Sequence, residues 1–227
     1  ENVEYTIHFR TKDKPYIPPT DPTKTLVMPN AMPAAQRIYD YLWESYGEKC
    51  LSGAMAKVAW NIDEAQWVYN NTGKWPAMAT FDYIHLDYSP TGWIDYTNTA
   101  VAEDWWEAGG IVSASWHWNV PVSEGSSTHA FYTDNNSFSV KRALREGTWE
   151  NEVMKADLAE MADMLLLLQN KGIPVVWRPL HEAAGNIYEP WHGTAWFWWG
   201  NDGAEAYREL WLTMFDYFVE RGINNLI

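Results

Sequence analysis

The sequence predicts an α/β fold, a (β/α)8 TIM barrel of which this chain supplies about the first four to five strand–helix units. Helix patterns and short apolar strands alternate from residue 33 onward, as is typical of a parallel sheet covered by helices. The strands are apolar throughout, so we expect both of their faces to be buried. A third observation favours the barrel over an open nucleotide-binding sheet. The segment after the first strand, Ala56–Trp60, lacks the glycine-rich turn that such a sheet carries.

The predicted elements follow one another in a regular order. Helices are predicted over residues 33–46, 63–71, 97–106, 150–170 and 204–220. Strands are predicted over residues 51–55, 76–84, 111–115, 173–177 and 225–227. The clearest helix is 150–170, whose apolar residues recur at helical spacing: Val153, Met154, Leu158, Met161, Leu165 and Leu168. Glycine follows each helix, as is common at helix C-termini: Gly47, Gly73, Gly109, Gly172 and Gly222.

The chain divides into two parts. Residues 1–34 are predicted to be an N-terminal extended arm, because prolines interrupt every helical or strand period there. Residues 35–227 form the first part of the barrel. Strand one begins near residue 50 and strand five near residue 225, so each unit takes roughly 44 residues and eight units would end near residue 400. We therefore expect the remainder of the barrel to be missing from this chain, because a closed barrel leaves no unpaired edges.

The composition excludes several classes of partner. Lys and Arg number 16 against 30 Asp and Glu, a formal net charge of −14, and an acidic chain repels nucleic acid and anionic membrane surfaces. The longest apolar run, Met164–Leu168, is far shorter than the ~20 residues of a transmembrane span. A single cysteine, Cys50, excludes an intrachain disulfide. The 16 Trp and 13 Tyr instead indicate carbohydrate, because exposed aromatic faces stack against the C–H faces of sugars.

Candidate catalytic residues gather in the stretch W-R-P-L-H-E-A-A-G at 177–185. The preceding strand delivers Arg178, His181 and Glu182 to its C-terminal end, where barrel enzymes carry their active sites. Glu182 fits a general acid. Spacing alone supports equally well a structural salt bridge between Glu182 and a neighbouring arginine.

The same stretch resembles part of the zinc-protease signature H-E-x-x-H, but it does not fit a metal site. The second histidine would have to stand at residue 185, which is Gly185. The signature also requires a helix, whereas a strand precedes this segment and Pro179 lies within it. We therefore predict no metal and no cofactor.

Three motifs of this sequence resemble those of glycoside hydrolase family 26, a family made up mostly of β-mannanases. They are 177–185, W-F-W-W-G at Trp196–Gly200, and G-G-I-V-S-A-S-W-H-W at Gly109–Trp118. The resemblance covers about residues 35–227 and implies a (β/α)8 retaining glycosidase with its acid/base on strand four and its nucleophile on strand seven. Glu182 lies at the end of the fourth predicted strand, in agreement. The insertion Asn186–Ala195 and the absent second half depart from the family pattern.

The resemblance implies a role for individual residues. Glu182 would be the acid/base, and the nucleophile glutamate is expected beyond residue 227, since Glu189 and Glu205 do not occupy strand ends. Arg178 would hold the carboxylates electrostatically. The predicted substrate-binding residues are His117, Arg178, His181, Trp196, Trp116 and Tyr188.

Neighbouring residues have less specific interpretations. Phe197–Trp199 are expected to be packing residues. Asp82, at the end of strand two, is expected to serve as a cap or turn residue rather than to face the cleft. The long loops Asn119–Trp149 and Asn186–Ala195 are expected to wall a polysaccharide cleft, although the longer one also fits a disordered insertion.

The function implied is that of a retaining endo-β-1,4-mannanase acting on mannan, glucomannan or galactomannan. β-1,3-xylanase, mixed-linkage glucanase and non-catalytic carbohydrate binding remain as alternatives. The expected partners are a β-mannan-type polysaccharide or oligosaccharide and the missing C-terminal part of the barrel. Because a polymer cannot enter a cytoplasm, we expect a secreted, periplasmic or cell-surface protein.

Overall fold

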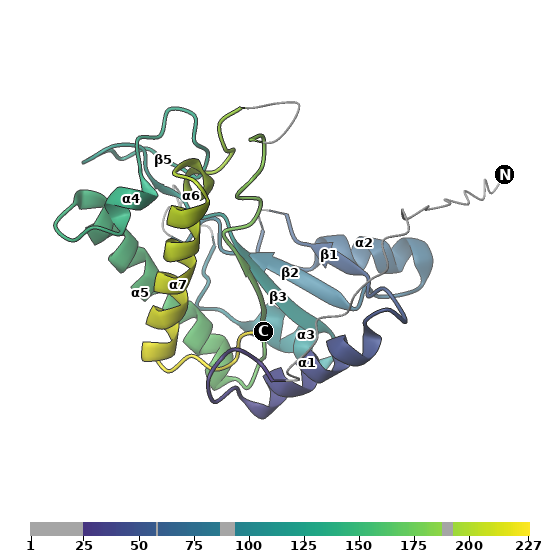
Figure 1. Ribbon diagram of the computed structural model, residues 1–227. Helices are drawn as coiled ribbons and strands as arrows, with labels where there is room; N and C mark the ends of the chain where they lie inside the picture. Colours follow the sequence, from purple (N-terminus) through teal and green to yellow (C-terminus); the bar gives the residue numbers. More distant parts are fainter. Residues whose placement is uncertain (1–24, 58, 87–93, 188–192) are drawn as a thin grey trace, which may run out of the picture.

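A four-stranded parallel sheet forms the centre of the computed structural model, which describes residues 25–57, 59–86, 94–187 and 193–227. Its strands are β1 (Gly53–Met55), β2 (Met78–Asp82), β3 (Ile111–Trp116) and β6 (Val176–Pro179), in that spatial order (Figure 1). All three pairings are parallel. The four predicted strands and their parallel pairing are therefore confirmed, and β6 is the fourth barrel strand.

The fifth predicted strand begins beside β6. Leu226 forms a parallel bridge with Val175. The Ile227 N–H donates to the Val175 carbonyl at 2.9 Å, and the Trp177 N–H donates to the Ile227 carbonyl at 3.0 Å. Strands one to five thus lie next to one another in chain order, as they do around a (β/α)8 barrel.

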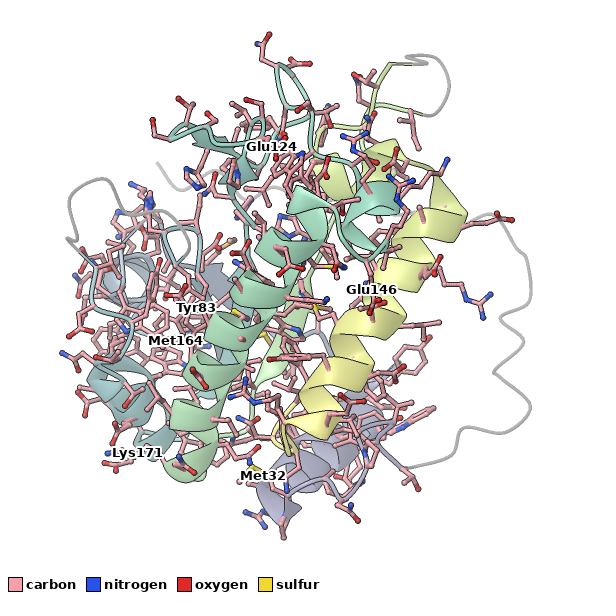
Figure 2. The ribbon with its side chains drawn as sticks, turned by 90° about the vertical axis from the view of Figure 1, so that its left-hand side faces the viewer. Met32, Tyr83, Glu124, Glu146, Met164 and Lys171 are labelled. Carbon is pink, nitrogen blue, oxygen red and sulfur yellow. The ribbon has the colours of Figure 1, made fainter. Side chains whose placement is uncertain are left out.

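The predicted helices are present with small shifts of their ends. They are α1 (Pro33–Ser45), α2 (Asp63–Thr72), α3 (Ala100–Glu107), α5 (Trp149–Asn170) and α7 (Ala204–Glu220). Figure 2 shows α5 and α7 side by side, and Figure 1 places both along the sheet. None of the described helices combines the length and the apolarity that crossing a bilayer requires.

The structure also contains short elements that the sequence did not predict. They are the antiparallel pair of β4 (Val120–Pro121) and β5 (His129–Ala130), the one-turn helix α4 (Val140–Ala143) and the one-turn helix α6 (Trp198–Asn201). Each is too short to show a hydrophobic period. In Figure 1, β5 and α6 lie together at one end of the sheet.

Helix α5 shows how the sequence determines one element. The Thr148 hydroxyl caps its first turn by accepting from the Asn151 N–H at 3.2 Å. The apolar face that repeats at helical spacing is buried: Met154, Leu158, Met161, Leu165 and Leu168. At β3 all six positions are buried, as predicted for a strand covered on both faces. The prediction is wrong for the edge strand β1, in which Gly53 and Met55 are exposed.

Many of the tryptophans lie inside the molecule rather than in a cleft. Trp116, Trp118, Trp198 and Trp199 are among the largest fully buried side chains. They cluster behind the carboxyl ends of the strands, with Trp116 stacked on Trp118 and Trp198 edge-on to Trp118. Part of the high tryptophan content therefore serves to pack this end of the sheet, and not only to form exposed aromatic surfaces.

The predicted arm of residues 1–34 falls largely outside the described residues. Of the part that is described, Met28 is buried and the backbone N–H of Met32 donates to the Asn224 carbonyl at 2.8 Å. Helix α1 begins at Pro33, where proline suits the first helical turn.

Candidate active site

The predicted catalytic residues meet at the carboxyl ends of β3 and β6. A cavity of about 390 Å³ there is lined by Met55, Thr80, His117, Arg178, His181, Glu182 and Phe197. Parallel strands bring their carboxyl ends to the same edge of a sheet, so residues 117 and 178–182 meet although about 60 residues separate them. Among the described residues no cluster of His, Cys, Asp and Glu has the arrangement of a metal site.

Asp82 orients His117. Its buried carboxylate, at the end of β2, accepts from the His117 backbone N–H at 3.1 Å and hydrogen-bonds Nδ1 of the same imidazole. The prediction of a cap or turn role for Asp82 is therefore wrong. The parallel register pairs Asp82 with Ser115 and so brings its carboxylate to His117.

His117 in turn contacts His181, with 3.1 Å between the two Nε2 atoms. When Nδ1 of His117 donates to Asp82, its Nε2 accepts and Nε2 of His181 donates. Burial, together with the charges of His117 and Arg178, lowers the pKa of His181 to about 4. The negative charge of Asp82 acts in the opposite direction and raises this pKa, but by less. The His181 imidazole is therefore uncharged near neutral pH.

Glu182 lies in a turn with unusual backbone geometry. Leu180 and Glu182 have φ angles of +47° and +54°, in the left-handed region that non-glycine residues seldom adopt. The Glu182 carboxylate lies 3.9 Å from the Arg178 guanidinium, and both side chains are about half exposed. Such an exposed pair is weak, so the salt-bridge interpretation of Glu182 accounts for little stability. The weak ion pair leaves the Glu182 carboxylate available to a ligand.

Trp196 forms an aromatic surface beside Glu182. Its side chain is exposed, and its backbone N–H donates to the Gly185 carbonyl at 3.3 Å. A Cβ at residue 185 would lie 2.6 Å from Cε3 of the indole. Glycine is therefore needed at the end of H-E-x-x-G so that the Trp196 ring can pack over the turn that carries Glu182.

One predicted substrate-binding residue, Trp116, is not brought to the cavity. Trp116 is fully buried and stacks on Trp118 with 4.1 Å between ring centroids, so the prediction that it contacts substrate is wrong. Adjacent strand residues point to opposite faces, and His117 rather than Trp116 faces the cavity. Tyr188 lies outside the described residues, as does Glu189.

Tyr132, which no sequence motif indicated, lies against Phe197 of the cavity lining. The segment 131–133 runs antiparallel to 196–198, with the Thr133 N–H donating to the Trp196 carbonyl at 2.8 Å. The exposed Tyr132 ring stacks on Phe197 with 5.7 Å between centroids. The aromatic pair Phe131-Tyr132 inside a polar loop was the available signal. The longer predicted loop is thus joined to the segment that follows the shorter one.

Asp157 supports the site from α5 and leads to a testable prediction. Its carboxylate accepts from the Trp118 indole N–H at 2.6 Å. Burial raises the pKa of Asp157 to about 7, assisted by the charge of Glu160 and opposed by the Trp118 hydrogen bond.

We predict that Asp157→Asn flattens the pH dependence of stability. Between the pKa of an unfolded aspartate, about 3.9, and the raised native value the folded state binds more protons than the unfolded state. The stability contributed by this group is therefore present at low pH and lost as the pH rises through 7. Melting temperatures at pH 5 and pH 8 should differ less in the variant than in the parent. Exposed Asp104→Asn is the control, and equal pH slopes in the parent and Asp157→Asn would contradict the prediction.

The fold and the site define a class of protein. A histidine pair and a glutamate stand at the carboxyl ends of parallel strands in a partial (β/α)8 barrel, and residues 27–227 match the model of glycosyl hydrolase family 26. The chain belongs to this family.

Relatives with established names are mannanases. Mannan endo-1,4-beta-mannosidase B of Piromyces sp is 36% identical over 212 residues, which cover 89% of this chain and 35% of the relative. Mannan endo-1,4-beta-mannosidase of Bacillus subtilis (strain 168) is 29% identical, with 90% of this chain and 58% of the relative covered. The chain spans between about a third and three fifths of these relatives.

Solved structures show the same fold. The GH26 domain of the endo-beta-mannanase/endo-beta-glucanase from Prevotella bryantii superposes with a TM-score of 0.81 at 44% identity, covering 87% of this chain and 62% of that chain. A beta-mannanase from a symbiotic protist of the termite Reticulitermes speratus, complexed with gluco-manno-oligosaccharide, gives 0.75 at 34% identity, covering 90% and 63%. The family and fold predicted from the sequence are confirmed.

Proposed function

We propose that this chain is the first part of the catalytic barrel of a retaining endo-β-1,4-mannanase, which hydrolyses mannan, glucomannan or galactomannan with Glu182 as acid/base. The observation that carries the proposal is the position of Glu182 beside the Asp82–His117–His181 chain of hydrogen bonds at the strand ends. The names of the relatives support a mannan substrate.

In this mechanism the Glu182 carboxylic acid donates its proton to the glycosidic oxygen as the bond to the leaving sugar breaks. A second carboxylate, ~5–5.5 Å from the first, attacks the anomeric carbon and forms a glycosyl-enzyme. Glu182, now ionised, then takes a proton from the water that hydrolyses this intermediate. Glu182 carries the only carboxylate among the residues that line the described cavity. The resemblance to the family implies that the nucleophile lies on strand seven, beyond residue 227.

The surrounding residues prepare this chemistry. Arg178 supplies positive charge beside Glu182, which stabilises ionised carboxylates at the site. His117 and the uncharged His181 border the cavity and offer imidazole edges to sugar hydroxyls or to the nucleophile. Trp196 and Tyr132, both exposed, offer ring faces on which sugars stack.

The substrate can be tested directly. A polypeptide that joins this chain to the remaining barrel strands should be assayed on linear mannan, galactomannan, β-1,3-xylan and barley glucan. Release of reducing sugar from the mannans supports the proposal. Turnover of only xylan or glucan would assign another β-glycanase activity, and binding without turnover would assign a carbohydrate-binding protein. A polymeric substrate also supports a secreted, periplasmic or cell-surface location, which fractionation of the producing cells tests.

We predict that Asp82→Asn lowers kcat by roughly 10- to 10³-fold, a smaller loss than the ~10⁴-fold that the same change causes in a catalytic triad, because His117 transfers no proton in the proposed mechanism. The asparagine amide would donate to Nδ1 of His117, so the imidazole proton would move to Nε2, where it faces His181. Steady-state kinetics and melting temperature should be measured together, with exposed Asp95→Asn as the control. An unchanged kcat would show that the tautomer of His117 is irrelevant.

A further inference from the structure

Helix α6 connects the two strand ends that form the site. The Trp198 indole N–H donates to the backbone carbonyl of Trp118 at 2.8 Å, directly after His117. The Trp199 indole N–H donates to the carbonyl of His181 at 2.9 Å, directly before Glu182. Both indoles are fully buried. Two consecutive tryptophans thus each hold one strand end.

Helix α6 packs so closely on the turn after β6 that only glycine fits at residue 200, the end of the W-F-W-W-G motif. A Cβ at Gly200 would lie 2.1 Å from the Ala183 carbonyl oxygen, so α6 packs directly on the backbone of the turn that carries Glu182. The Phe197 ring lies 5.8 Å from the His117 ring and 5.3 Å from the His181 ring, between centroids. Each residue from 197 to 200 therefore contacts one or both strand ends.

The turn at Glu182 requires such support. Leu180 and Glu182 both have positive φ angles, a strained backbone conformation that persists only where the surrounding structure holds it in place. The Trp199 hydrogen bond holds residue 181, which lies between them. A second bond, from the Tyr207 hydroxyl of α7 to the Leu180 carbonyl at 3.0 Å, holds residue 180.

The strand end at His117 is held in the same manner. Trp118 receives the Trp198 hydrogen bond at its carbonyl, donates its own indole N–H to Asp157, and stacks on Trp116. The backbone carbonyl of Trp118 follows the end of β3, so it has left the sheet ladder. A buried carbonyl in that position needs a donor, and Trp198 supplies it.

We propose that Trp198 and Trp199 are positioning residues, which hold His117 and Glu182 at a fixed distance from each other through their indole N–H groups. This inference rests on the proposed function. It assigns a mechanistic role to residues that the sequence analysis treated as packing. The indole N–H groups set the geometry in which Glu182 reaches the glycosidic oxygen, and the rings fill the core beneath it.

The test removes the N–H groups and keeps the aromatic rings. In the barrel-completed polypeptide, Trp198→Phe and Trp199→Phe should each lower kcat on mannan by roughly 10- to 100-fold, because a displacement of about 1 Å costs about 10² in rate. KM should stay within about twofold, since neither side chain lines the cavity. For Trp199→Phe the loss should be smaller on an aryl glycoside with a good leaving group, which needs little protonation by Glu182.

Trp105→Phe is the matched control. The buried Trp105 indole donates to the Ile111 carbonyl at 3.1 Å, at the opposite end of β3. This variant should lower the melting temperature and leave kcat unchanged. If a Phe variant does not fold, replacing the tryptophan site-specifically with β-(3-benzothienyl)alanine keeps the bicyclic shape and removes only the N–H.

Each outcome has a distinct meaning. Inactivity of the parent on all glycans would refute the proposed function. An active parent whose Trp198 and Trp199 variants retain kcat would overturn the positioning role alone. Equal loss of kcat in Trp105→Phe would overturn it as well, because the effect would then follow stability rather than position.

Discussion

Replacement of Glu182 by alanine is expected to lower the hydrolysis of mannan by roughly 10²–10⁴-fold, the range that general acid catalysis contributes. The sugar leaving group of a mannan is a poor one, so its departure depends on the proton that Glu182 donates. A phenolate leaving group needs little protonation, and its glycosylation step should lose far less rate. Measuring kcat/KM for mannan and for an aryl β-mannoside in the barrel-completed polypeptide gives both values.

The control for this experiment is Glu146→Ala. Exposed Glu146 lies between α4 and α5 (Figure 2) and is absent from the cavity lining. This variant removes one negative charge, as Glu182→Ala does, and should change neither rate. Equal losses on the two substrates in Glu182→Ala would show that the residue has a structural rather than an acid role.

Much of the fold was predictable because its signals are local. The period of α5, its Thr148 cap and the glycine after it lie within one stretch of sequence, and the structure confirms that helix. The buried strands are short apolar runs between such helices. Parallel order follows because each strand–helix–strand connection is a crossover. These rules place Glu182 at a strand end without knowledge of any contact.

The contacts within the site were not predictable in the same way. Asp82 and His117 lie on different strands, and only the register of β2 on β3 brings them together. The side chains of Trp116 and His117 alternate, so only one of them can face the cavity, and composition cannot say which one. Helix α6 has four residues, too few for a period. Its role depends on carbonyls 80 and 18 residues away in the sequence.

The largest effect on folding and on activity is expected when the missing strands of the barrel are added. A polypeptide limited to residues 1–227 should aggregate or fold poorly and show no measurable mannanase activity. In the described sheet β1 pairs on one side with β2, and residues 225–227 pair on one side with the segment leading into β6. Such edges and the apolar side chains beside them, including Trp211 and Phe215, need further strands and helices to cover them. The strand-seven carboxylate would be absent as well.

Adding the remaining strands, in one polypeptide or as a separate chain, should restore both a cooperative melt and mannan hydrolysis, because closure pairs the edges and brings the second carboxylate opposite Glu182. A completed barrel whose strand-seven glutamate is replaced by alanine separates the two effects, since it should melt cooperatively and turn over nothing. A cooperative melt together with mannan cleavage by residues 1–227 alone would contradict the prediction. The nucleophile would then have to be found within this chain, among Glu103, Glu124, Glu189 and Glu205. Of these, Glu103 already bonds Thr99 and Lys171, so Ala substitutions of the other three would be the first experiment.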